Sequence, residues 1–173
     1  MKRLLLAAGA TALLAGAAAA QDAAPKIGII LGFTGPLESI TPFMAQAAEV
    51  AIAEVNAAGG ILGQQVTSER ADSTCIDAAA ATAAAEGLVG GGINAIMGAD
   101  CSGVTNAILT NVAVPNGIGM ISPSATSPAL STAEDNGLFF RTAPSDARQG
   151  VVMSEILMDR GVDEVALTYT NND

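Results

Sequence analysis

Short apolar runs recur along the chain between longer segments with helical spacing. After Pro25, the run from Lys26 to Leu31 is rich in β-branched residues, which is typical of a strand buried on both faces of a parallel sheet. Comparable runs predict further strands at residues 65–70, 93–97, 117–121, 138–141 and 164–169. The chain is therefore expected to contain a series of short strands.

The intervening segments predict helices. Thr41 and Pro42 occupy positions typical of an N-cap and a first helical residue, and Gly59-Gly60 is typical of a helix end. The apolar face of this helix is expected to comprise Met44, Ala48, Ala51, Ile52 and Val55. Further helices are predicted from Asp77 to Val89, from Ser102 to before Pro115, and from Ser145 or Asp146 to Arg160. Strands that alternate with helices predict an α/β fold with a doubly wound parallel sheet.

The first twenty residues have the layout of a signal peptide. Lys2 and Arg3 precede an apolar run from Leu4 to Leu14, and small residues follow up to Ala20. Cleavage is expected after Ala20, which would export the protein to the periplasm. A retained transmembrane anchor is the alternative, but the segment is alanine-rich and polar residues follow it directly. We expect no direct membrane insertion after cleavage.

Charge narrows the range of partners. The formal net charge is −10, and it becomes −12 without residues 1–20, which contain two basic residues and no acidic one. Nucleic acids and anionic membrane surfaces repel such a protein, and the sequence has no basic cluster to offset the mean field. Neither is an expected partner.

Cys75 and Cys101 are the only cysteines. In an exported protein an even number of thiols usually pairs, so a disulfide is expected. A catalytic thiolate is an alternative, but the chain has no histidine to act as its base. Zinc is weaker still, because two cysteines without histidine do not complete the usual ligand sets.

Three segments follow predicted strands and should meet at one edge of the sheet, where ligands of open parallel sheets bind. They are residues 32–39, 98–105 and 121–128. Their hydroxyls, backbone donors and backbone carbonyls suit a zwitterion. The candidate binding residues are Phe33, Thr34, Ser102, Ser124, Ala125 and Thr126. From spacing alone, a simpler interpretation is that Ser102 only caps its helix and Thr126 only shapes a turn.

Enzyme motifs are missing. A phosphate-binding loop needs Gly-Lys-Ser or Gly-Lys-Thr, yet the only lysines are Lys2 and Lys26. Gly90-Gly91-Gly92 precedes a strand, unlike a dinucleotide-binding fingerprint. A Ser-His-Asp triad is impossible without histidine. We therefore predict no enzyme, no catalytic residue, no metal and no cofactor.

Several segments in the correct order carry a resemblance to a known family. They are Gly35-Pro36, Asn56–Gly63, Asp72–Cys75, Cys101-Ser102, Ser122–Pro128 and Phe140–Thr142. Across residues 26–173 the chain resembles the type I periplasmic binding proteins of ABC importers, specifically the leucine/isoleucine/valine-binding branch.

The resemblance implies roles for particular residues. It implies a disulfide between Cys75 and Cys101 beside the pocket, and contact of Ser102 with the α-amino acid group of the ligand. It implies that the Ser124 carbonyl holds the ammonium and that Thr126 contacts the ligand through its hydroxyl and amide. The resemblance therefore favours ligand-binding roles for Ser102 and Thr126 over the simpler roles of helix cap and turn residue. Ile40 stands where the branched-chain proteins place an aromatic residue over the ligand side chain.

The resemblance also implies a domain organisation. Residues 21–142 would form an incomplete N-terminal ligand-binding lobe, and residues 143–173 a hinge crossover and the start of an incomplete second lobe. The protein is expected to bind a branched-chain or related amino acid, small carboxylate or amide, and to deliver it to the membrane permease of an ABC importer. A ligand-sensing domain of the same fold with a regulatory or signalling role is the alternative.

Overall fold

The computed structural model describes residues 24–169, so the predicted signal peptide lies outside the described residues. Five parallel strands form one sheet in the order β2-β1-β3-β4-β5. Their bounds are Lys26–Leu31 (β1), Thr67–Asp72 (β2), Ala95–Gly98 (β3), Gly119–Ser122 (β4) and Phe139–Arg141 (β5). The doubly wound α/β prediction is confirmed.

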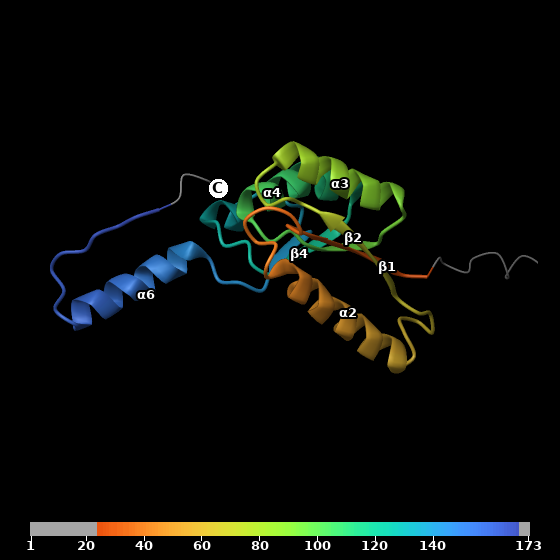
Figure 1. Cartoon of the computed structure of the whole chain (residues 1–173), viewed down its shortest axis with the longest axis horizontal. Helices are drawn as coiled ribbons and strands as arrows, with labels where there is room; N and C mark the ends of the chain where they lie inside the picture. The colour runs from red at the N-terminus through yellow and green to blue at the C-terminus, as the bar shows by residue number, and fades with distance from the viewer. Residues whose placement is uncertain (1–23, 170–173) are drawn as a thin grey trace, which may run out of the picture.

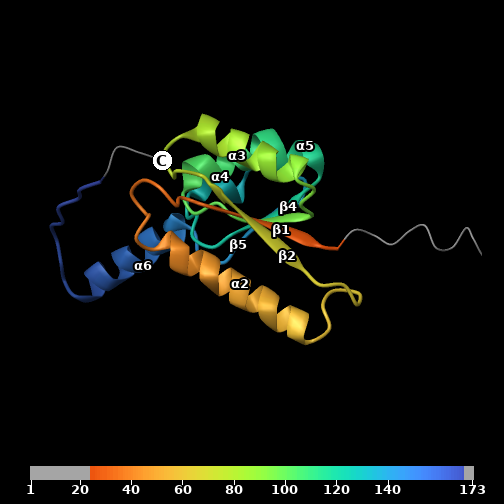
Figure 2. The same ribbon diagram turned by 45° about the vertical axis from the view of Figure 1, so that its right-hand side comes forward.

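Helices cover both faces of the sheet, as Figures 1 and 2 show. One face carries α2 (Thr41–Ala57), and the other carries α3 (Ala78–Gly90), α4 (Ser102–Ile108) and α5 (Val114–Asn116). A π-helical segment, η1 (Leu109–Ala113), joins α4 to α5, and a short 3₁₀ helix, η2 (Pro128–Ser131), follows β4. The last helix, α6 (Asp146–Asp159), extends away from the sheet. None of the described helices is long and apolar enough to cross a membrane.

The core consists of two apolar layers, one on each side of the sheet. In the larger layer, side chains of α3, α4 and η1 pack on strand residues such as Ile30 and Ile96. In the smaller layer, Ala45 of α2 packs on Ile29 and Leu31 of β1. Alternate residues of β1 therefore serve opposite layers, which accounts for its apolar composition.

The start of α2 differs from the prediction. Ile40 is the N-cap, and Thr41 is already the first helical residue. The Thr41 side chain is buried, and its hydroxyl donates to the Gly32 carbonyl at 2.8 Å. Thr41 therefore fastens the helix to the end of β1 instead of capping the helix.

The buried face of α2 is also narrower than predicted. Met44, Ala48 and Ile52 pack on the smaller core layer, as expected. Ala51 and Val55 are instead exposed. The predicted face was therefore partly wrong.

The helix after β3 does not stop before Pro115, as the sequence predicts, but continues through it to Asn116. Proline lacks an N–H group, and its ring collides with the carbonyl four residues earlier in an α-helix. The wider π-helical turns of η1 precede it, and the Asn116 side-chain amide donates to the Val112 carbonyl at 2.8 Å. This bond gives the Val112 carbonyl a donor near the end of the helix.

The strand predicted at residues 164–169 does not form. These residues are exposed and pair with no described strand. A strand needs neighbours to satisfy its backbone groups, so an apolar run alone does not make one.

Candidate functional site

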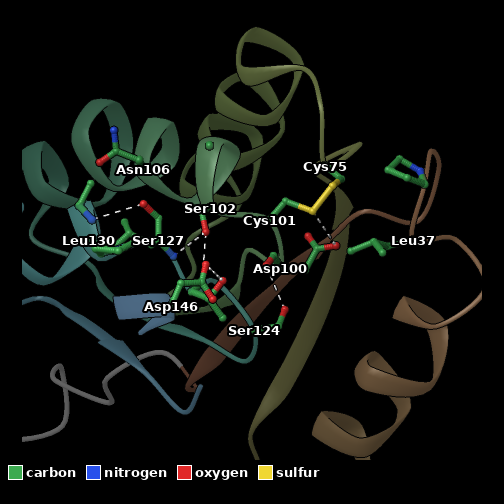
Figure 3. Close-up of a pocket in the computed structure, with 15 residues that line it drawn as sticks. Leu37, Cys75, Asp100, Cys101, Ser102, Asn106, Ser124, Ser127, Leu130 and Asp146 are labelled. Carbon is green, nitrogen blue, oxygen red and sulfur yellow. Dashed lines mark hydrogen bonds between the residues drawn. A yellow bond between two sulfur atoms is a disulfide. The ribbon is translucent and has the colours of Figure 1, made fainter. Parts of the chain in front are cut away.

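The loops that follow the strands surround a cavity of about 750 Å³. Its walls come from the β1–α2 loop, the ends of β2 and β3, the turn after β4, η2 and the start of α6 (Figure 3). The lining residues are Pro36, Leu37, Cys75, Asp100, Cys101, Ser102, Gly103, Asn106, Ser124, Thr126, Ser127, Pro128, Ala129, Leu130 and Asp146. This is the carboxyl edge of the sheet, where the sequence places the ligand site.

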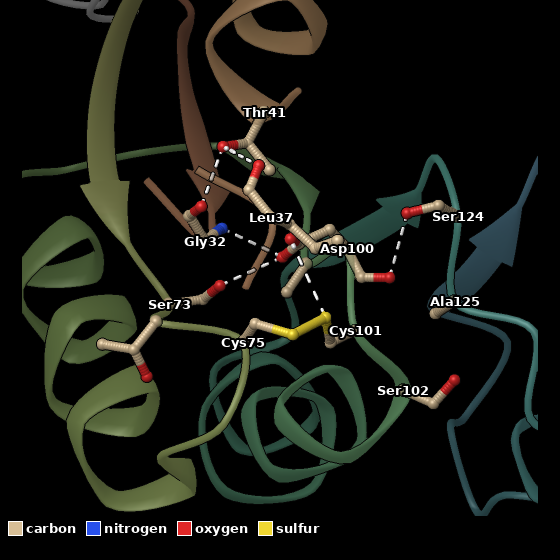
Figure 4. The surroundings of a disulfide bond; sticks show 12 residues. Gly32, Leu37, Thr41, Ser73, Cys75, Asp100, Cys101, Ser102, Ser124 and Ala125 are labelled. Atoms are coloured by element: carbon tan, nitrogen blue, oxygen red, sulfur yellow. Dashed lines mark hydrogen bonds between the residues drawn. A yellow bond between two sulfur atoms is a disulfide. The ribbon is translucent and has the colours of Figure 1, made fainter. Parts of the chain in front are cut away.

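Cys75 and Cys101 form a disulfide on the cavity wall, as predicted, with their Cα atoms 5.2 Å apart. The bond joins the loop after β2 to the loop after β3 (Figure 4). It also removes the possibility of a metal at this point: Cys75, Cys101 and the Asp100 carboxylate lie within reach of one another, but disulfide sulfurs are not thiolate ligands.

Asp100 ties the strand ends together. Its carboxylate oxygen Oδ1 accepts from the Gly32 backbone N–H at 3.0 Å and from the Ser73 hydroxyl at 3.1 Å. Its backbone carbonyl accepts from the Ser124 hydroxyl at 2.9 Å. Segments following β1, β2, β3 and β4 are thus connected through one buried residue (Figure 4). The sequence analysis did not single out Asp100.

Ser102 is the first residue of α4, and it does not cap that helix, because Cys101 is the N-cap and makes no side-chain capping bond. The Ser102 hydroxyl oxygen instead accepts from the backbone N–H groups of Thr126 and Ser127, at 3.1 and 3.0 Å. The predicted approach of Ser102 to the turn after β4 is therefore confirmed. The start of α4 and the turn after β4 therefore contact one another through the Ser102 hydroxyl and the backbone amides of Thr126 and Ser127.

Side chains beneath the turn after β4 hold its shape. Buried Ser122 donates its hydroxyl to the Ala99 carbonyl at 2.5 Å and accepts from the Ala125 N–H at 2.9 Å. The Arg141 guanidinium donates to the carbonyls of Ala125 and Ser127 at 3.2 and 2.8 Å. The turn is therefore fixed from two sides before any ligand arrives.

Asp146 adds a carboxylate to the cavity that the sequence analysis treated only as a possible helix cap. Its side chain accepts from the Thr126 hydroxyl at 2.9 Å, and its N–H donates to the Thr126 carbonyl at 3.0 Å. The cap of α6 is Ser145, whose hydroxyl accepts from the Ala147 N–H. An acidic residue after a helix cap is too common to be a sequence signal for a site.

Three of the six candidate residues line the cavity: Ser102, Ser124 and Thr126. Ala125 is fully buried and points into the core. Phe33 and Thr34 lie outside the lining, and Pro36 and Leu37 form the wall of the first loop in their place. Ile40 is exposed and also lies outside the lining. Contact of any of these residues with a ligand remains a prediction.

Phe33 and Thr34 hold the first loop in position. The ring of Phe33 packs on the smaller core layer, and the Arg70 guanidinium lies 5.5 Å from its centroid. The Thr34 hydroxyl donates to the Asp72 carboxylate at 2.6 Å, and the Thr74 N–H donates to the same carboxylate at 2.8 Å. Burial opposes ionisation of Asp72, but these hydrogen bonds hold its pKa below the usual value.

A glycine completes this first wall. Gly35 has a φ of +91°, and a Cβ at this position would lie 2.6 Å from the Thr74 carbonyl oxygen. Only glycine allows both the left-handed conformation and the close approach of the two loops. Pro36 and Leu37 follow directly, so this contact sets where their side chains meet the cavity.

A parallel α/β fold with a cavity of hydroxyls, amides and carboxylates at its strand ends is the architecture in which ligands of open parallel sheets bind. Residues 24–173 match the periplasmic binding protein family, and the chain belongs to that family. It is 34% identical over 158 residues to Leu/Ile/Val-binding protein homolog 3 of Brucella melitensis. That alignment covers 91% of this chain but 42% of the relative, so the chain spans less than half the length of that protein.

Solved structures show the same likeness. The substrate-binding protein LivJ of the branched-chain amino acid transporter of Streptococcus pneumoniae, in complex with isoleucine, has a TM-score of 0.72 and 31% identity. The match covers 80% of this chain and 39% of LivJ. A substrate-binding protein of an ABC transporter from Desulfitobacterium hafniense, in complex with leucine, has a TM-score of 0.69 and 26% identity, with 80% and 40% covered.

Proposed function

We propose that the protein is an extracytoplasmic solute-binding component of an ABC importer that binds the α-amino and α-carboxyl groups of an amino acid without altering it. The observation that carries this proposal is the junction of Ser102 with the Thr126 and Ser127 amides, beside the Asp146 carboxylate. Donors for an anion and an acceptor for a cation therefore lie next to one another, as the two charged groups of a zwitterion require.

The donor side suits the carboxylate. The amides of Thr126 and Ser127 point at one place, the Ser102 oxygen. A ligand carboxylate that enters there can accept from the Ser102 hydroxyl and share the amides. Charge-assisted bonds of this kind are stronger than the neutral ones they replace. The donors need little rearrangement, because Ser122 and Arg141 already hold the turn.

The acceptor side suits the ammonium. Asp146 carries a negative charge at the cavity wall, and Thr126 fixes its position. We expect the Ser124 backbone carbonyl to contribute a second acceptor. A carboxylic acid without an amino group would gain no contact with Asp146, so the proposed ligand is an amino acid rather than a simple acid.

The comparisons support transport rather than catalysis. The relatives named above are binding proteins, and the structural neighbours are ABC transporter substrate-binding proteins. We infer from this a permease partner in the membrane and, with the predicted signal peptide, a periplasmic location.

NMR titration of the ¹⁵N-labelled protein with leucine tests the proposal, because amide shifts also detect weak binding. Each contact in a water-filled cavity contributes only about 0.5–1.5 kcal/mol, so binding by this lobe is expected to be weak. We expect shifts at the Thr126 and Ser127 amides with leucine, and smaller ones with its deaminated acid. Ser102→Ala should abolish them, and Ser154→Ala, an exposed change on α6, should not. If no amino acid shifts these amides, the proposal is wrong.

A further inference from the structure

Among the described residues, one carboxylate oxygen of Asp100 receives no hydrogen bond from an N–H or O–H group. The residue is only 2% exposed, and Oδ1 takes both the Gly32 N–H and the Ser73 hydroxyl. The other oxygen, Oδ2, lies 3.9 Å from the sulfur of Cys101. That sulfur belongs to the disulfide and has no hydrogen to donate. Within residues 24–169, no N–H or O–H group donates to Oδ2.

This oxygen belongs to the wall of the ligand cavity. Asp100 is among the lining residues, and Figure 3 shows its carboxylate between the disulfide and Leu37. Its Ser124-bonded carbonyl lies toward the junction where we place the ligand's α-groups. The carboxylate is thus positioned beyond the α-groups, on the side of the cavity bounded by the first loop.

The charged groups in the lining of the cavity are acidic. Two carboxylates, Asp100 and Asp146, line it, and no lysine or arginine is among the lining residues. A buried carboxylate without a cation, and with one oxygen lacking a donor, is costly unless something supplies the missing hydrogen bond. Asp146 is exposed and accepts a hydrogen bond from Thr126, so Asp100 is the carboxylate that lacks a hydrogen-bond donor.

We propose that Asp100 Oδ2 accepts a hydrogen bond from the side chain of the bound amino acid. This inference rests on the proposed function and narrows its substrate class. The ligand is an amino acid whose side chain carries a hydroxyl, amide or ammonium donor, in preference to an aliphatic one. A hydrocarbon side chain against Oδ2 would leave the buried charge without a donor, which a site built around a polar contact does not tolerate.

Ligand pairs that differ in one side-chain donor group test this proposal in the same NMR titration of the protein. Threonine and valine differ by a hydroxyl for a methyl group, asparagine and leucine by an amide for two methyl groups, and lysine and norleucine by an ammonium. We expect the donor-bearing member of at least one pair to bind about tenfold more tightly or better. The pair with the largest ratio identifies the donor type.

Asp100→Asn is the matched variant. Its carbonyl oxygen can still accept from Gly32 and Ser73, while its NH₂ group replaces Oδ2 and turns the acceptor into a donor. We expect the preference for the donor-bearing ligand to disappear, with the Thr126 amide still responding to amino acids. If the variant does not fold, the ratios of the unmodified protein decide the question.

The outcomes separate the two proposals. Equal or tighter binding of valine, leucine and norleucine by the unmodified protein would overturn the role of Asp100 and leave amino acid binding intact; Oδ2 would then hold only water. Absence of any amino acid binding would instead overturn the proposed function. A persistent preference in Asp100→Asn would show that another group selects the side chain.

Discussion

The Ser122 hydroxyl illustrates how much one buried polar group supports at this site. It donates to the Ala99 carbonyl and accepts from the Ala125 N–H, so it joins β3 to the turn that carries Thr126. Ser122→Ala would leave both backbone groups without that partner. We expect a loss of about 1–3 kcal/mol in the free energy of unfolding, measured by urea denaturation. The exposed change Ser154→Ala is the control and should stay within about 0.5 kcal/mol.

Asp72 predicts a dependence of stability on pH. Its pKa in the folded protein lies below its ordinary value of 3.8, because hydrogen bonds from Thr34 and Thr74 outweigh the effect of burial. Because the pKa of Asp72 is lower in the folded than in the unfolded protein, ionised Asp72 stabilises the folded protein above pH 3.8. This contribution to the free energy of unfolding is lost as the pH falls through the folded pKa. Between pH 7 and pH 2.5, the free energy of unfolding should therefore decrease more steeply with falling pH for the unmodified protein than for Asp72→Asn. Parallel curves would contradict this assignment.

Two helix starts show which local signals can be read from sequence. Asp77, where the sequence predicts the start of a helix, caps α3, and its carboxylate accepts from the N–H groups of Ala79 and Ala80 at 3.0 and 2.9 Å. Thr41 has an equally suitable side chain, but its hydroxyl reaches a carbonyl at the end of β1. A cap is a local contact, whereas the position of Thr41 depends on how α2 docks on the sheet. Sequence alone carries only the first kind of information.

The cap of α3 gives a prediction at the scale of the element. Asp77→Ala should lower the free energy of unfolding by about 1 kcal/mol, because two N–H groups at the first turn lose their acceptor. Asp77→Ser, which retains a capping oxygen, should restore most of the loss. Thermal unfolding monitored by circular dichroism distinguishes the two variants. Equal destabilisation would indicate that the charge, not the cap, is what matters.

The site was predictable in outline for a topological reason. All parallel strands end at one edge, so the three segments after strands had to meet there, and Ser102 does meet the turn after β4. Which side chains face the cavity depends on tertiary hydrogen bonds. Thr34 turns to Asp72, whereas Asp100 and Asp146 turn to the cavity. No residue spacing encodes those choices.

The disulfide acts on the whole molecule, because it joins loops from two neighbouring crossovers. Replacing Cys75 and Cys101 together by serine should lower the free energy of unfolding by up to about 3.5 kcal/mol, mainly because the unfolded chain gains conformational entropy without the cross-link. Guanidinium denaturation of the oxidised protein and of the double variant measures the difference. Thiol titration of the folded protein should find no free thiol, and a reactive thiol would contradict the pairing.

The sheet face shared with α2 is only partly covered within the described residues. Ile121 of β4 is 44% exposed and Phe140 of β5 is 60% exposed, both on apolar surface that α2 does not reach. Contiguous apolar surface promotes association. We expect the chain to self-associate at high concentration and Phe140→Ser to reduce this, as measured by sedimentation velocity. Leu62→Ser, at a more exposed position in the loop between α2 and β2, is the control.

The order of the strands determines how the chain can fold. Strand β1 comes first among the described strands, yet it lies inside the sheet and pairs with both β2 and β3, so that Ile27 lies between Ser68 and Ala95. Its sheet partners therefore appear only after two long connections. Closing such loops costs entropy before any pairing energy is gained, which slows folding. Until Ala95–Gly98 has formed and paired with β1, the apolar residues of β1 remain exposed to chaperones and to aggregation.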